Sequence, residues 1–151
     1  MAQLPSPTRV ELQLLAESRL AEAEALIHGG FFDGAVYLAG YAVELAFKAR
    51  ICERLNSDYP TEFASFKTHA YGVLLKLAGL EAELNQKKLQ DTAFATNWSL
   101  VATPGTSPVD NWSENWRYRP VGKVTAADAQ RFIQALRDPA SGVLTWLKTL
   151  W

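Results

Sequence analysis

Apolar and polar residues recur along the chain with the period of an α-helix, and no stretch alternates with period two. Between Ala35 and Ala49 apolar residues fall on every side of the helical wheel, and only Glu44 and Lys48 carry charge. A helix that is apolar all round is either a membrane span or the central helix of a bundle. Because the run is shorter than the roughly 20 residues that a bilayer requires, it predicts a buried central helix over residues 31–55.

A first helix is predicted before the central one. Thr8 and Glu11 have the spacing of a capping box, which opens a helix that continues to about His28. Gly29-Gly30 ends it, since glycine is the usual residue just past a helix C-terminus. The turn is short, so the central helix is expected to return antiparallel to the first.

Three further helices are predicted after the central one, over residues 66–78, from about 80 to 101, and from 125 to the end. The last opens with a second capping box, Thr125 and Asp128, and either kinks or restarts at Pro139. Residues 103–124 are predicted to form a long loop, and loops of that length are often functional. The predicted fold class is all-α: an up-and-down bundle of about five helices, forming a single domain over residues 1–151 after a loose leader at 1–7.

Composition narrows the possible partners and compartments. The net charge is −1, so nucleic acid could be held only by a local cluster of Lys and Arg. Cys52 is the single cysteine, which excludes an intrachain disulfide and fits a reducing compartment. The N-terminus has no apolar run like that of a signal peptide. We therefore expect a cytoplasmic protein that does not associate with a membrane.

Several catalytic and metal-binding motifs are absent from the sequence. The segment GGFFDG, residues 29–34, lacks the lysine and the spacing of a phosphate-binding loop. One cysteine and two distant histidines exclude a zinc site of the usual Cys/His spacing. A carboxylate-rich metal site stays open, but no Glu-x-x-His pair supports one. No metal and no cofactor are predicted.

Three segments in order resemble the HEPN family, small helical domains named for a proposed nucleotide-binding role. The first is FDGAVYLAGYAVELAFKA, similar to the family's second helix with its Glu and Lys one turn apart. The second is KTHAYGVLLKLAG, which resembles the third helix and has His69 in the His position. The third is WSENWRYRP, which is similar to a Trp-to-Arg-Tyr stretch before the last helix in one branch of the family.

The resemblance implies a bundle of four or five helices that commonly dimerises. It also implies a metal-independent ribonuclease, or a partner of a small nucleotidyltransferase in a toxin–antitoxin or defence system. Ribonuclease members carry an Arg followed shortly by a His near the last helix. Arg117 is the counterpart of that Arg, but no histidine follows His69. The ribonuclease motif is therefore missing.

The candidate binding pocket consists of Glu44, Lys48, Arg117, Tyr118 and Arg119, with His69, Trp112 and Trp116 as further candidates. Glu44 and Lys48 either form a partly exposed pair on one helix face, or Glu44 orients Arg117 across the bundle. His69 is either a cap or packed imidazole, or a general base.

The aromatic and basic loop also has two interpretations. Its arginines and rings either bind phosphate and stack on bases, or form a lid over one end of the bundle. Trp146 and Trp151 belong either to the core or to a dimer interface.

Three functions follow from these residues. The first is a dimeric binding module in an RNA- or nucleotide-linked system, with a possible nucleotidyltransferase-type partner and without standard ribonuclease catalysis. The second is a divergent metal-independent ribonuclease that uses Arg117, Arg119 and Glu44. The third is a scaffold that only dimerises.

Overall fold

The computed structural model describes residues 4–151, and that range contains seven α-helices, two short 3₁₀-helices and no strand. The all-α class is confirmed, with two more α-helices than expected. Met1–Gln3, the start of the predicted leader, lie outside the described residues. The elements are α1 (Arg9–His28), α2 (Phe32–Leu55), η1 (Ala64–Phe66), α3 (Tyr71–Leu77), α4 (Glu81–Gln90), α5 (Thr92–Ala102), η2 (Glu114–Tyr118), α6 (Ala126–Arg137) and α7 (Val143–Lys148).

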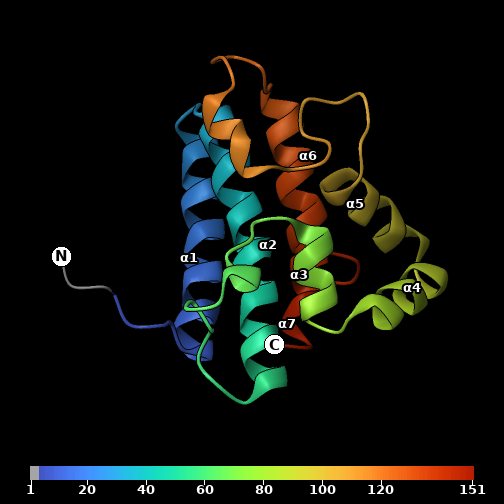
Figure 1. Cartoon of the computed structure of the whole chain (residues 1–151). Helices are drawn as coiled ribbons and strands as arrows, with labels where there is room; N and C mark the ends of the chain where they lie inside the picture. The colour runs from blue at the N-terminus through green and yellow to red at the C-terminus, as the bar shows by residue number, and fades with distance from the viewer. Residues whose placement is uncertain (1–3) are drawn as a thin grey trace.

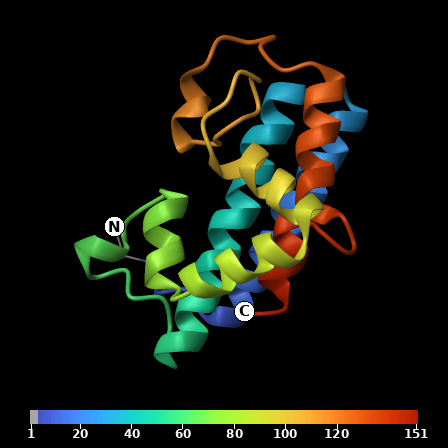
Figure 2. The same ribbon diagram turned by 90° about the vertical axis from the view of Figure 1, so that its right-hand side faces the viewer.

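Helix α2 is the centre of the bundle. It packs against α1 along its length, and it also contacts α3, α6, α7 and η2. Figure 1 shows α1 and α2 side by side, and Figures 1 and 2 together place α3, α4 and α5 on the side of α2 away from α1. The predicted capping box of Thr8 and Glu11 is present, and Gly30 takes a positive φ in the turn to α2. No described helix is long and apolar enough to span a bilayer.

The third and fourth predicted helices each differ from the prediction. Only Tyr71–Leu77 of the predicted third helix is α-helical, because residues 67–70 do not continue η1 and Ala70 is extended at the N-cap of α3. The predicted fourth helix is divided at Asp91, whose backbone is extended and whose side chain accepts a hydrogen bond from the Phe94 N–H. That bond lowers the pKa of Asp91 and starts a new helix, α5.

The last predicted helix stops and restarts rather than kinking. It opens with the predicted Thr125 capping box and ends at Arg137, and Pro139 lies in the turn before α7 rather than in its first turn. The Asp138 carboxylate accepts from the backbone N–H groups of Ser141 and Ala140, which lowers its pKa and fixes this turn. Trp146 of α7 packs against the core ring of Phe94, in agreement with the core alternative for this residue.

The loop between α5 and α6 is tied to the bundle at two places. Near its middle, the Asn111 and Trp112 N–H groups donate to carbonyls of α5. Near its end, the carboxylate of Asp33, in the first turn of α2, accepts from the N–H groups of Gly122 and Val124. The loop is therefore held in one place relative to α2.

Trp112 lies directly on the backbone of α2 at Gly40. A Cβ at Gly40 would overlap the indole ring, so only glycine permits this approach. The Trp112 Nε1–H donates to the carbonyl oxygen of Tyr37 at 3.1 Å, and the Tyr71 ring stacks on the indole with centroids 5.3 Å apart. This contact places the following residues, including η2, beside α2.

We expect Gly40→Ala to destabilise the protein by about 1–3 kcal/mol, because the added methyl displaces Trp112 from a packed site. Gly72→Ala is the matched control. Gly72 is also helical, a Cβ there meets nothing within 4 Å, and alanine favours a helix by about 1 kcal/mol over glycine. Urea unfolding of both variants tests the prediction, and equal stabilities of the two variants would contradict it.

Candidate functional site

One face of α2 carries a line of polar side chains that leads into the bundle. Tyr37, Tyr41, Glu44 and Lys48 recur every three or four residues, so they share a helix face; we refer to these four as the α2 polar strip. Tyr71 of α3 and Trp112 pack beside its tyrosines. Glu44 is only 2% exposed. It is the only Asp, Glu, Lys, Arg or His side chain that is buried in the described chain.

Glu44 is held by two nitrogen groups. The Lys48 Nζ donates to Oε1 at 2.7 Å, and His69 Nδ1 lies 3.0 Å from both carboxylate oxygens. No buried side-chain polar atom in residues 4–151 lacks a hydrogen-bond partner. A buried carboxylate requires such partners, because the loss of its hydration is costly unless the charge is paired.

The expected contact from Glu44 to Arg117 is wrong. Within the described chain, Glu44 forms ion pairs with Lys48 and His69 only. The non-helical segment 67–70 brings His69 over the carboxylate. Arg117 instead lies near Tyr37, two helical turns closer to the N-terminus of α2. One alternative predicted that Glu44 and Lys48 form a partly exposed ion pair. The pair is present, but it is more buried than that alternative predicted.

The ring of His69 has one engaged and one open nitrogen. A carboxylate only accepts hydrogen bonds, so Nδ1 carries the hydrogen that points at Glu44. The neutral ring then has its lone pair on Nε2, and no hydrogen bond in residues 4–151 uses that atom. The His69 side chain is 43% exposed, and it is not the cap of α3, since Ala70 takes that position.

The two tyrosines of the strip connect this centre to Arg117. The hydroxyls of Tyr37 and Tyr41 lie 3.3 Å apart, and the Tyr41 ring meets the His69 ring edge-on with centroids 6.1 Å apart. Burial raises the pKa of Tyr41, the bond to Tyr37 and the charge of Glu44 act in the same direction, and the charge of Arg117 opposes them. Tyr41 therefore lies within electrostatic range of both charged groups.

Arg117 and Tyr118 of η2 are exposed to solvent. The Arg117 guanidinium lies 4.9 Å from the centroid of the Tyr118 ring. Its interactions with the hydroxyls of Tyr118 and Tyr37 raise the pKa of Arg117. Because no carboxylate of the described chain lies within 4.0 Å of it, its charge is available to an anion.

The other aromatic and basic candidates hold the loop in place. Trp112 is buried on Gly40, and Trp116 packs on Phe132 of α6. The Arg119 guanidinium covers the Trp116 ring at 4.3 Å, and its Nη2 donates to the Pro108 carbonyl at 2.7 Å. The lid interpretation therefore describes these three residues, and the exposed Arg117 and Tyr118 are not part of the lid.

Tyr37 and Tyr41 were absent from the predicted site. The signal for them was present, because they precede Glu44 by seven and three residues and so share its face of a helix. In the sequence, both tyrosines fall within the predicted all-round apolar surface of the central helix.

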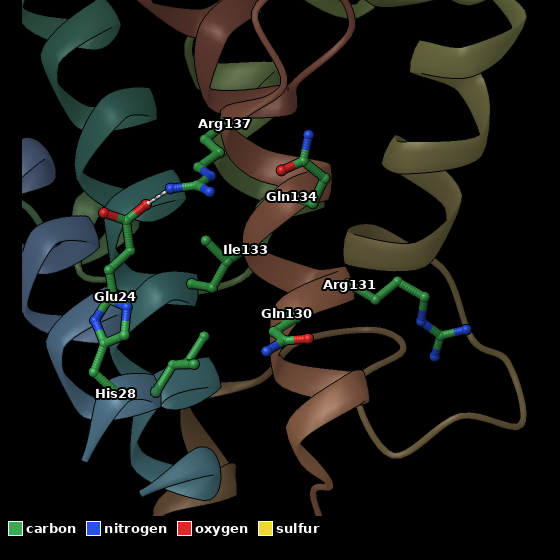
Figure 3. A pocket seen from close by; sticks show the side chains of 8 residues that line it. Glu24, His28, Gln130, Arg131, Ile133, Gln134 and Arg137 are labelled. Atoms are coloured by element: carbon green, nitrogen blue, oxygen red, sulfur yellow. Dashed lines mark hydrogen bonds and ion pairs between the residues drawn. The ribbon is translucent and has the colours of Figure 1, made fainter. Parts of the chain in front are cut away.

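A separate hollow of about 550 Å³ lies between α1 and α6 and contains none of the predicted site residues. Figure 3 shows Glu24 and His28 of α1 facing Gln130, Gln134 and Arg137 of α6, with an ion pair between Glu24 and Arg137 across the hollow. In that pair the charges of Glu24 and Arg137 neutralise each other. No group of three or more His, Cys, Asp or Glu residues in the described range could hold a metal ion.

The bundle and its polar strip define a small all-helical module with a candidate site on the central helix. The chain belongs to the HEPN family, since the model of the HEPN domain matches residues 11–148. This membership supports a helical module linked to nucleotides or RNA. No curated protein and no solved structure matches the chain significantly.

We expect Lys48→Met to destabilise the protein by about 3 kcal/mol, because it leaves the buried Glu44 carboxylate without its closest partner. The double variant Glu44→Gln/Lys48→Met should recover part of this loss, since no unpaired charge remains. Arg19→Met is the control, because it removes an exposed pair on α1, which is worth less than about 1 kcal/mol. Chemical denaturation measures all three, and a loss no larger for Lys48→Met than for Arg19→Met would contradict the prediction.

Proposed function

We propose that this chain is a dimeric binding module for RNA or a nucleotide in a toxin–antitoxin or defence-type system, and that it lacks the standard ribonuclease motif of its family. The site is the α2 polar strip together with His69, Arg117 and Tyr118. The observation that carries the proposal is the unpaired, exposed guanidinium of Arg117 beside an exposed aromatic ring, next to a strip with a buried charge.

The charges of the site favour an anionic ligand. Glu44 contributes one negative charge, which Lys48 neutralises at 2.7 Å. Arg117 then leaves the site with a positive charge, and protonation of His69 would add a second. An arginine can bind a phosphate with two parallel hydrogen bonds, which makes it the favoured residue for this ligand.

The aromatic side chain gives the site a means of contacting a base. Tyr118 is 76% exposed, and its ring lies against the Arg117 guanidinium. Single-stranded nucleic acids are bound by this combination, in which a cation holds the backbone and a ring stacks on a base. Lys48 and Arg119 support the site indirectly, through Glu44 and through the loop.

A homodimer, a nucleotidyltransferase-type partner and a cytoplasmic location are parts of the same proposal. Family membership supports the homodimer, because domains of this family often dimerise. Apolar side chains exposed on α1, among them Val10 and Leu14, offer surface for a contact between copies. The single cysteine, Cys52, is buried, and burial raises the pKa of its thiol to about 11.

We expect the protein to bind a single-stranded RNA oligonucleotide in a salt-sensitive manner. Arg117→Ala should weaken binding about tenfold and lower the slope of log K against log salt by about 0.7, the value for one phosphate contact on a single strand. Fluorescence anisotropy in EDTA at several salt concentrations measures both quantities.

Arg19→Ala is the control for this experiment, since Arg19 lies on α1 and is paired with Glu22. It should leave both affinity and slope unchanged. An absence of binding to RNA and to nucleotides at low salt would contradict the proposal and would favour a scaffold that only dimerises. Equal losses in Arg19→Ala and Arg117→Ala would show that binding is not located at this site.

A further inference from the structure

We propose that the outer side of α1 is the surface through which two copies of this chain pair, with their α1 helices antiparallel. This inference rests on the homodimer of the proposed function and names its surface. Helix α1 packs against α2 on one side and meets α6 and α7 on a second side. The remaining side carries six exposed residues at helical spacing, which we call the α1 outer stripe: Glu11, Leu14, Ser18, Ala21, Ala25 and His28.

The outer stripe does not have the composition of a solvated helix face. Such a face is normally polar or charged, but the four central positions of the stripe hold one leucine, one serine and two alanines. Leu14 is 62% exposed, and Val10 and Leu15 beside it are exposed as well. Spacings of three and four residues alternate along the stripe, which is the pattern of helices that pack along their length.

Each end of the stripe has a feature that fits the other end. At the start of α1, a hollow of about 510 Å³ is lined mainly by leucines and by the prolines at 5 and 7. At the end of α1, Phe31 is 65% exposed, and its ring lies against Gly29 beside the stripe. Aromatic side chains that fill pockets on the partner carry much of the binding energy of protein interfaces. The anchor and the hollow are at opposite ends of one helix, so they meet only between two copies.

A twofold axis midway along the stripe brings these features together. Leu14 of one copy then faces Ala25 of the second copy, and Ser18 faces Ala21. A large side chain thus meets a small one, and the small pair at the axis lets the helices approach closely. The same register brings Phe31 to residue 8, next to the hollow at residues 4–7. In such an interface every contact occurs twice.

The charges of α1 favour the antiparallel arrangement. It places Glu11 of one copy opposite His28 of the second copy, whereas a parallel pair would place Glu11 against Glu11. Glu17 and Glu24 border the stripe, and each forms an ion pair with a basic side chain of its own copy, on α7 and on α6. These two glutamates therefore do not oppose the approach of a second α1.

This surface keeps the two candidate ligand sites apart. The α2 polar strip contacts α3 and the segment before it, and α3 lies on the side of α2 away from α1 (Figures 1 and 2). Pairing through α1 therefore turns both strips away from the twofold axis. The dimer is a bivalent module in which each copy has its own open site.

The first test measures the mass of the full chain in solution by sedimentation equilibrium. Wild type should be a dimer. Leu14→Glu should weaken dimerisation at least about 100-fold, because the symmetry buries two unpaired carboxylates in the interface. Leu89→Glu is the matched control, since Leu89 is an exposed leucine on α4, away from α1, and it should remain dimeric. Circular dichroism checks that both variants are folded.

The second test detects the register without disrupting the dimer. In Leu14→Cys/Ala25→Cys the two thiols of one copy are about 16 Å apart along α1, too far for an intrachain disulfide. Across the axis they face each other, so mild oxidation should give a covalent dimer on a denaturing gel. Leu89→Cys is the control and should stay monomeric on that gel. The native Cys52 is buried.

The outcomes separate this inference from the proposed function. A dimer that Leu14→Glu leaves intact, or no covalent dimer from the double variant, overturns the α1 surface and leaves the homodimer standing. A monomeric wild type overturns both. A short single-stranded RNA should bind once per chain, and Leu14→Glu should change its affinity by less than about twofold, because the strip lies away from α1. A dimeric wild type that binds no RNA or nucleotide overturns the proposed ligand and leaves the α1 surface standing.

Discussion

The structure depends on how a carboxylate is accommodated inside the central helix. Glu44 lies in a helix whose other core-facing residues are small or apolar, and it is almost fully buried. An isolated charge there would cost several kcal/mol, so partners must reach it. One comes from the next turn of the same helix, Lys48, and the other, His69, comes from a segment that leaves helical conformation just before α3. The non-helical conformation of residues 67–70 thus allows His69 to pair with the buried charge of α2.

A second constraint lies one turn away on the same helix. Gly40 has no side chain, so Trp112 can lie on the backbone of α2 and donate to the Tyr37 carbonyl. The Tyr71 hydroxyl donates to the Gly40 carbonyl at 2.6 Å, so α3 and the long loop meet at the same residue. The absence of a Cβ at Gly40 therefore allows the long loop to pack on α2 at the residue where α3 is also bound.

Much of the fold could be predicted from local signals, and the site could be predicted only in part. The capping boxes at Thr8 and Thr125 and the apolar central helix depend on neighbouring residues, and all three have the predicted form. The break at Asp91 was missed because an aspartate within a helical pattern can be a cap or a solvated side chain, and only its bond to the Phe94 N–H decides. The pair of Glu44 with Lys48 was one of the predicted alternatives, but the contact of Glu44 with His69 was not predicted. Whether His69 or Arg117 reaches the carboxylate depends on the path of two non-helical segments, which periodicity does not describe.

The sequence distances within the site have a consequence for the order in which the chain can acquire it. Glu44 and His69 are separated by 25 residues, whereas Trp112 and Tyr37 are separated by 75, and Val124 and Asp33 by 91. Closing a longer loop costs more entropy, so contacts between distant residues form late in folding. During synthesis the buried charge can be paired as soon as α3 has emerged, long before Arg117 is in place. A partly folded chain would then contain the paired glutamate and histidine but not Arg117, so the proposed phosphate site would be complete only after both distant segments had folded.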